Sequence, residues 1–486
     1  MLIEHNIQDR LYCITTDNAS NNGTLCESLS ALLDEKGIKW DDTKNHIACL
    51  THIINLAVKE FLKTLKIQER TPEDEWEVLE YRARIASSKK KSKYTIKGTN
   101  PFDRAIQKVR KISGLINFPP SHHTSFVLVC EAVGIKPKRA VKDVETRWNS
   151  TYCMLVRAVY LKEAIDMWVK SRKDYQTLVL DIEEWKKLEF LVHFLAPFYI
   201  TTLRLQASTV PTLQQTFETY EGLFNSIDNV RGIFQDMSIR PDWIQDIETG
   251  IDAMWGKLRD YYSDAKPYAY GDAILLHPSE KLRWFKKQEW KADKIEAYRA
   301  STSRRFDIQY SKTAALGEGR KRSFQMMNDD SDSDDAIQSE FDSYIQQQRV
   351  RGIENPLVWW KTVEGIYPHL SKMAKDTFAV PATGSGVERE FSISGAIVTR
   401  GRNRLDPTTI SDIMHYKRWL SRRGVVANYL KELDRNEDME SESGDEAKSN
   451  TDSEEEELNQ DLIDWLFTWQ KAEELKSRGK RLEPTN

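Results

Sequence analysis

The chain is 486 residues long, more than a single hydrophobic core usually supports, so we expect two or three folded units joined by linkers. Hydrophobic residues make up 40% of the chain and charged residues 30%, which excludes a wholly disordered protein. The formal charge of −4 is uneven, because residues 432–457 hold 13 acidic and 2 basic residues and so leave +7 on the rest. A basic body with acidic segments is compatible with nucleic-acid binding, although solvated surface lysines are the commoner cause of such an excess.

Neither secretion nor membrane insertion is expected from the sequence. The opening residues hold no apolar run, and the most apolar stretch, residues 189–200, is interrupted by His193 and too short to span a bilayer. The five cysteines have irregular spacing and no Cys-x-x-Cys pair, which favours a reducing intracellular compartment over a disulfide framework.

The first part of the chain predicts alternating strands and helices. Residues 11–15 are typical of a short strand that runs into an Asx/Gly-rich turn and then a helix through about Glu35. Residues 46–65 follow the same plan, with the helical part presenting one apolar face made of Ile53, Leu56, Ala57 and Phe61. Such alternation predicts an α/β layer. The polar residues 66–104 are expected to form a loop or an insertion.

A long helical region is expected next, over residues 156–314, because apolar residues recur there at three- and four-residue spacing. Residues 315–350 contain five aspartates between Asp329 and Asp335 and predict a disordered acidic linker.

Order is expected to return at residue 353. An apolar stripe follows, interrupted by Pro368 at the start of a second helix and formed by Trp359, Val363, Ile366, Leu370 and Met373. Residues 432–460 are expected to be disordered, and residues 461–478 to form one amphipathic helix.

Four segments in a fixed order carry a family resemblance. They are TTDNASNN (15–22), CLTHIINL (49–56), ETRWNSTYCML (145–155) and SGVEREFSISG (385–395) followed by TRGRNRL. Together they resemble the hAT-superfamily DNA transposases over about residues 5–422. The resemblance implies a ribonuclease-H-like α/β fold with an Asp-Asp-Glu triad, interrupted by a large all-helical insertion before the Glu. It also implies that residues 1–155 form part of that fold and that residues 353–422 are a helical dimerisation region.

Asp17 and Glu388 match the second and third catalytic carboxylates of this family. Carboxylates converging at a sheet edge would bind Mg²⁺ and activate water or a 3′-hydroxyl for phosphoryl transfer. Local sequence alone favours a different interpretation for each. Asp17 fits an Asx-turn or helix cap, and Glu388 completes a capping box with Ser385. Glu390 does not align with the catalytic position.

Further candidate residues come from the same resemblance. Cys49 and His52 lie three apart, but no second Cys/His pair is placed to complete a zinc site; the family suggests that His52 lies near the scissile phosphate and that Cys49 packs. Trp148 fits an ordinary core residue, whereas its family counterpart stacks on a base flipped out of the DNA. The candidate DNA-backbone contacts are arginines, which solvated loops also contain: Arg147, Arg400, Arg402 and Arg404.

The family's zinc finger, first three strands and first catalytic Asp have no counterpart in this sequence. Three hypotheses follow. The first is a transposase-derived protein that binds DNA and pairs with a second copy of itself but does not cleave DNA. The second is an active cut-and-paste transposase whose N-terminal half is omitted from this sequence. The third is a domesticated transcriptional regulator that uses its acidic, aromatic end, residues 436–486, to bind a partner.

Two further expectations concern assembly and location. Dimerisation is expected within residues 353–422, because short helices there cannot bury all of Trp359, Trp360, Ile366, Leu370, Phe391 and Ile393 by themselves. The basic runs at residues 89–93 and 320–322 are candidate nuclear-import signals, so we expect a nuclear protein.

Overall fold

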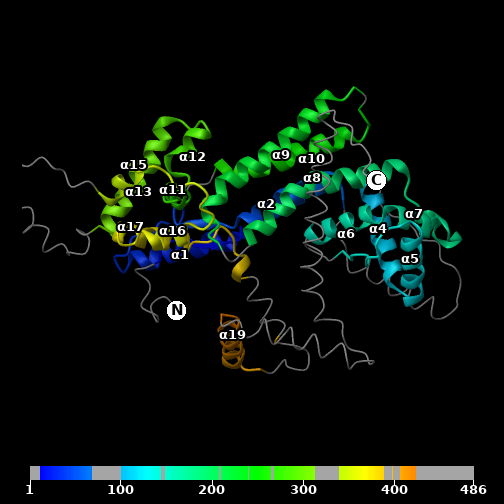
Figure 1. Ribbon diagram of the computed structural model, residues 1–486, viewed down its shortest axis with the longest axis horizontal. Helices are drawn as coiled ribbons and strands as arrows, with labels where there is room; N and C mark the ends of the chain where they lie inside the picture. Colours follow the sequence, from blue (N-terminus) through cyan, green and yellow to red (C-terminus); the bar gives the residue numbers. More distant parts are fainter. Residues whose placement is uncertain are drawn as a thin grey trace, which may run out of the picture. The chain divides into compact units, whose positions relative to one another are not determined.

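The structure is a computed structural model that describes residues 11–67, 100–143, 148–206, 210–238, 240–263, 268–311, 339–387, 397 and 405–422. The chain divides into two compact units, residues 1–384 and residues 385–486. The described part is mostly helical, with one small sheet (Figure 1). The large helical part expected from the sequence is therefore confirmed, whereas the α/β part comprises, in the described residues, a single strand–helix–strand unit.

The sheet consists of two parallel strands of three residues each. β1 (Ile14–Thr16) and β2 (His46–Ala48) pair with Thr15 opposite Ile47. Parallel pairing requires a crossover connection, and α1 (Ser20–Asp34) provides it. α2 (Leu50–Thr64) follows β2 directly. The strand–helix–strand–helix order predicted from the sequence is confirmed.

α2 is a central helix of the first unit. Its apolar face packs on α10 (Ile244–Ser263) and on α8 (Ile182–Gln206). α10 comes so close that a Cβ atom added to Gly250 would lie 2.9 Å from Cδ2 of Phe61. The Phe61 ring also meets Phe194 of α8, with ring centroids 4.8 Å apart. The crossing of α2 and α10 therefore depends on the absence of a side chain at Gly250.

Residues 101–206 form a helical bundle. Besides α8 it contains α4 (Pro101–Asn117), α5 (Pro120–Ala132), α6 (Trp148–Tyr160), α7 (Lys162–Lys170) and the 3-10 helix η2 (Lys173–Leu178). Lys108 of α4 and Glu184 of α8 are both buried and joined at 2.7 Å. The boundary expected at residue 155 falls inside α6, which packs on both α4 and α8, so the bundle begins earlier in the chain than the sequence indicated.

α8 is the one described helix that is long and apolar enough to cross a membrane by length and composition. The sequence expectation that its apolar stretch is too short was wrong, because the helix runs for 25 residues. α8 packs on α2, α4, α6 and α9 (Thr216–Asp236), and its large apolar residues Trp185, Leu188, Leu191 and Phe198 are buried. These contacts account for its composition as that of a core helix.

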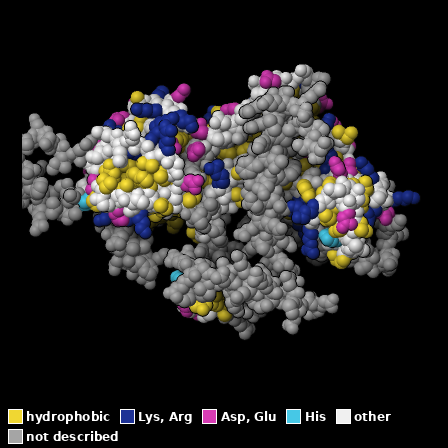
Figure 2. Space-filling view, viewed as in Figure 1, with side chains coloured by type: hydrophobic (Ala, Val, Ile, Leu, Met, Phe, Trp, Pro, Cys, Tyr) yellow, Lys and Arg dark blue, Asp and Glu magenta, His cyan; other side chains and the backbone are white. Residues whose placement is uncertain are grey.

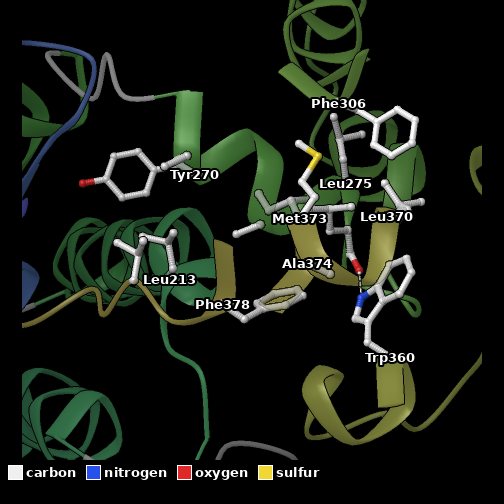
Figure 3. Close-up of a cluster of buried hydrophobic side chains, with 14 of the residues drawn as sticks. Leu213, Tyr270, Leu275, Phe306, Trp360, Leu370, Met373, Ala374 and Phe378 are labelled. Carbon is white, nitrogen blue, oxygen red and sulfur yellow. Dashed lines mark hydrogen bonds between the residues drawn. The ribbon is translucent and has the colours of Figure 1, made fainter. Parts of the chain in front are cut away.

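A second hydrophobic cluster joins residues 268–311 to residues 339–380. The first of these segments forms α11 (Tyr268–Leu275), α12 (Lys281–Lys287) and α13 (Ala292–Gln309). The second forms α15 (Glu340–Gln346), α16 (Pro356–Thr362) and α17 (Pro368–Phe378). Figure 3 shows Trp360, Leu370 and Met373 among the residues of this cluster, with the Trp360 indole donating a 2.9 Å hydrogen bond to the carbonyl of Leu276. The short 3-10 helix η3 (Leu213–Gln215), which precedes α9, adds Leu213.

This cluster changes two expectations from the sequence. Pro368 begins α17, as predicted, but Trp360 and Leu370 are fully buried within the chain itself and so do not supply exposed apolar surface for a partner. α15 lies inside the segment expected to be a disordered linker, because Phe341 and Tyr344 pack into the cluster. Phe391, Ile393 and residues 432–478 lie outside the described residues.

A buried polar network ties the segment before β1 to the same cluster. Asp272 of α11 accepts hydrogen bonds from Tyr12 at 2.8 Å, from Arg305 at 2.7 Å and from Thr302 at 2.6 Å. The Arg305 guanidinium also lies 3.5 Å from the centre of the Tyr12 ring. Burial, followed by the charge of Asp272, raises the pKa of Tyr12, which stays a neutral donor.

In the second unit, α19 (Pro407–Arg422) begins where the Asp406 carboxylate accepts the Thr408 N–H at 2.9 Å.

Candidate functional site

Asp17 follows β1 directly and is exposed at the carboxyl end of the strand. Its Oδ1 accepts hydrogen bonds from the Ala19 N–H at 3.2 Å and from the Asn22 side-chain amide. The bond to Ala19 is the Asx-turn that local sequence favoured. Among the described residues, Oδ2 of Asp17 has no protein partner, so the turn leaves one carboxylate oxygen available to a ligand.

His46, which the sequence interpretation missed, contacts Thr16, the residue before Asp17. Its Nε2 is 2.7 Å from the hydroxyl oxygen of Thr16, and the Thr16 hydroxyl donates its proton to the backbone carbonyl of Asp17 at 2.9 Å. Burial lowers the pKa of His46, so the imidazole is mainly neutral at neutral pH. The parallel register sets His46 opposite Ile14, and this pairing is not visible in the spacing of the sequence alone.

Cys49 and His52 sit at the start of α2. The Cys49 N–H donates to the carbonyl of Thr16 at 2.8 Å, and its thiol is buried, 3.2 Å from the hydroxyl of Thr51. The packing role predicted for Cys49 is therefore confirmed. His52 lies in the first turn of α2 and is half-buried. Among the described residues, no three His, Cys, Asp or Glu side chains gather as a metal-binding group.

A distant segment, Pro381 to Gly384, lies against this end of the sheet. Three hydrogen bonds hold it there: Thr15 Oγ1 to the Pro381 carbonyl at 2.7 Å, the Leu50 N–H to the Ala382 carbonyl at 2.9 Å, and the Gly384 N–H to Cys49 Sγ at 3.2 Å. Thr15 and Pro381 are 366 positions apart in the sequence. The fold thus brings the segment just before Glu388 to the strand end that carries Asp17, while Glu388 itself lies outside the described residues.

Of the remaining candidates, Trp148 lies in the helical bundle and the arginines lie outside the described residues. Trp148 begins α6, is buried, and packs against Tyr152 and Tyr199 with ring centroids 6.0 and 6.3 Å away. Trp148 therefore occupies a core position, as its residue type predicted. The arginines predicted to contact DNA, Arg147, Arg400, Arg402 and Arg404, lie outside the described residues.

Two family models match the chain. Residues 340–420 match the hAT family C-terminal dimerisation region, and residues 47–194 match the ZBED1 RNase-like helical domain. The first match covers α15, α16, α17 and most of α19, and the second runs from β2 into α8. The second match crosses residue 155 without interruption, in agreement with the continuous helix α6.

Similar proteins come from fungi and plants. A Talaromyces stipitatus protein named as transcriptional regulator tpeD is 28% identical over 430 residues, which cover 85% of this chain and 46% of that protein. A Zea mays protein named as an AC transposase is 24% identical over 453 residues, 88% of this chain and 51% of that protein. The zinc finger BED domain-containing protein DAYSLEEPER of Arabidopsis thaliana is 24% identical over 300 residues, 57% of this chain and 40% of that protein.

The chain spans about half the length of the curated relatives it matches. These relatives include proteins named as AC transposases, BED zinc finger proteins and a transcriptional regulator, and residues 340–420 match the hAT dimerisation region. The chain is therefore similar to proteins of the hAT transposase family over most of its length, and it contains a match to that family's C-terminal dimerisation region.

Proposed function

We propose that the chain is a transposase-derived nuclear protein that pairs with a second copy of itself through residues 353–422 and binds DNA. The match to the hAT dimerisation region supports self-association. DNA binding is supported by the convergence of Pro381 to Gly384 on the strand end beside Asp17, because it brings the segment before Glu388 to Asp17, and both residues match catalytic carboxylates of the family. This convergence is the observation that carries the proposal.

The strand end is, in this proposal, part of a ribonuclease-H-like fold. The parallel pair β1–β2 with its helical crossover and the match to an RNase-like helical domain support that assignment. Asp17 and Glu388 would bind Mg²⁺, which would activate a water or 3′-hydroxyl, and His52 would lie near the scissile phosphate. The unpartnered Oδ2 of Asp17 fits a hard cation that prefers oxygen. Arg147, Trp148, Arg400, Arg402 and Arg404 are proposed DNA contacts.

Cleavage by these 486 residues alone is not expected. Two carboxylates, Asp17 and Glu388, correspond to the family's three, and metal ions must be fixed on both the attacking and the leaving oxygen. The test is incubation of the purified chain with a terminal-repeat duplex and Mg²⁺ or Mn²⁺. Cleavage that disappears in Asp17→Ala or Glu388→Ala would show that the chain is an active transposase.

DNA binding is tested by fluorescence anisotropy of a labelled duplex with the full chain over a range of salt concentrations. Binding through phosphate contacts should weaken steeply as salt rises, because condensed counterions are released on binding. A chain that binds no duplex at low salt would refute the DNA-binding function. Sequence-selective binding that persists at high salt would instead reveal a base-reading element.

A transcriptional regulator is the second candidate function, because one relative is named as such. In this alternative the acidic residues 432–460 and the expected helix 461–478 recruit a partner protein. The full chain, tethered to a reporter promoter, should then change expression, and removal of residues 432–486 should abolish the change. Equal expression with and without these residues would exclude this role for them.

A further inference from the structure

The exposed face of α12 is entirely basic. The exposed residues of this helix are Arg283, Lys286 and Lys287, while Trp284 and Phe285 on its other side are buried. Lys291 and Lys294, just after the helix, are exposed as well. Figure 2 shows the dark blue side chains gathered over α12. We call these five residues, Arg283, Lys286, Lys287, Lys291 and Lys294, the α12 basic surface.

Carboxylates nearby neutralise this surface only in part. Within residues 280–294 the acidic residues are Glu280, Glu289 and Asp293, against five exposed basic ones. Among the described residues, none of the five forms an ion pair within 4.0 Å, in contrast to Lys44, Lys162 and Arg231 elsewhere on the molecule. Burial, followed by the charge of Glu218, raises the pKa of Glu280, and the charges of Lys287 and Arg283 oppose that shift. The surface therefore keeps a net positive charge.

The helix that carries this charge is held firmly. The Trp284 ring stacks on Phe217 with centroids 5.8 Å apart, and the Phe285 ring stacks on Tyr298 at 5.7 Å. Lys281, buried at the start of the helix, donates to the carbonyl of Gln347 at 2.9 Å. Because the backbone is fixed by these contacts, ordering the basic side chains on a ligand costs only their own rotamer freedom. An aromatic side chain also lies next to the basic residues: Trp290 is half-buried, and Lys294 Nζ is 4.3 Å from its ring centre.

We propose that the α12 basic surface binds the phosphate backbone of duplex DNA. Duplex DNA presents closely spaced phosphates along an extended path, which matches several unpaired cations on one rigid helix face. Contacts of this surface with phosphates would position the DNA without selecting its sequence. This inference rests on the proposed DNA binding of the chain, and adds a contact surface outside the strand end and the arginine clusters.

The experiment compares three forms of the full chain by fluorescence anisotropy on one labelled duplex. They are the unaltered chain, Lys286→Glu with Lys287→Glu, and the control Lys36→Glu with Lys39→Glu, which makes the same charge change on exposed lysines at the far end of α1 from Asp17. The α12 variant should bind at least about tenfold more weakly than the control. The slope of log affinity against log salt should become shallower by the equivalent of about two phosphate contacts.

The outcomes separate this inference from the function on which it rests. If the unaltered chain binds no DNA, the proposed function fails. If it binds and the two variants lose affinity equally, the α12 basic surface is refuted while DNA binding stands. A second variant, Lys286→Gln with Lys287→Gln, controls for misfolding of the glutamate variant. Its circular dichroism spectrum should be unchanged, and it should lose DNA affinity to a smaller extent. Tighter binding of single-stranded RNA than of duplex DNA through this surface would overturn the assignment to DNA.

Discussion

The close crossing of α2 and α10 makes a sharp test of the fold. In Gly250→Ala the new Cβ would lie 2.9 Å from Cδ2 and 3.1 Å from Cε2 of Phe61, well inside the usual carbon–carbon separation of about 3.5–4.0 Å. Phe61 cannot swing away, because it is fully buried and meets Phe194. Overpacking of this kind costs about 1–3 kcal/mol.

Gly256→Ala is the matched control, since Gly256 lies in the interior of the same helix and a Cβ there would meet nothing within 4 Å. Both variants gain the same helix propensity, up to about 1 kcal/mol, so the difference between them isolates the steric cost of about 1–3 kcal/mol. Urea unfolding followed by circular dichroism gives both free energies, and the dependence on urea should be unchanged. Equal free energies of unfolding for Gly250→Ala and Gly256→Ala would refute the close approach of α2 and α10 at Gly250.

Three further predictions concern charge, pH and assembly. Arg305→Met should lower the free energy of unfolding by about 3–5 kcal/mol, because it leaves the Asp272 carboxylate buried without its cation; a loss under about 1 kcal/mol in urea unfolding would contradict this. Burial lowers the pKa of His277 from 6.5 to about 4, so acidification protonates the unfolded chain first. The free energy of unfolding should then fall by up to about 3 kcal/mol between pH 6.5 and 4, and His277→Gln should remove that slope. Val358→Arg with Ile366→Arg, at two exposed apolar positions in the dimerisation region, should abolish self-association in sedimentation without changing the circular dichroism spectrum.

Local patterns predicted the elements of this fold better than their grouping. The strand before Asp17 and the helix that begins at Pro368 were visible because apolar spacing and proline act within a few residues. The grouping of α4 and α5 with α8 depends on contacts such as that of Lys108 with Glu184, 76 positions apart. Such partners are chosen by the whole fold, and no local pattern identifies them.

The candidate site shows the same division. Asp17 and Cys49 were found because each belongs to a short recognisable segment, and the structure adds the environment of each side chain. His46 was missed because only the parallel register of the strands puts it beside Thr16. Trp360 was predicted to be surface for a partner, since the sequence does not show that Tyr344 and Tyr367 of the same chain already pack on it.

The central claim is that this chain pairs with itself and binds DNA. Sedimentation velocity of the full chain at micromolar concentration, recorded at the absorbance of the protein and of a labelled duplex, measures both at once. We predict a boundary of the size of a dimer or larger without DNA, and co-sedimentation of the duplex with that species at low salt. A monomer that leaves the duplex sedimenting on its own would contradict the account.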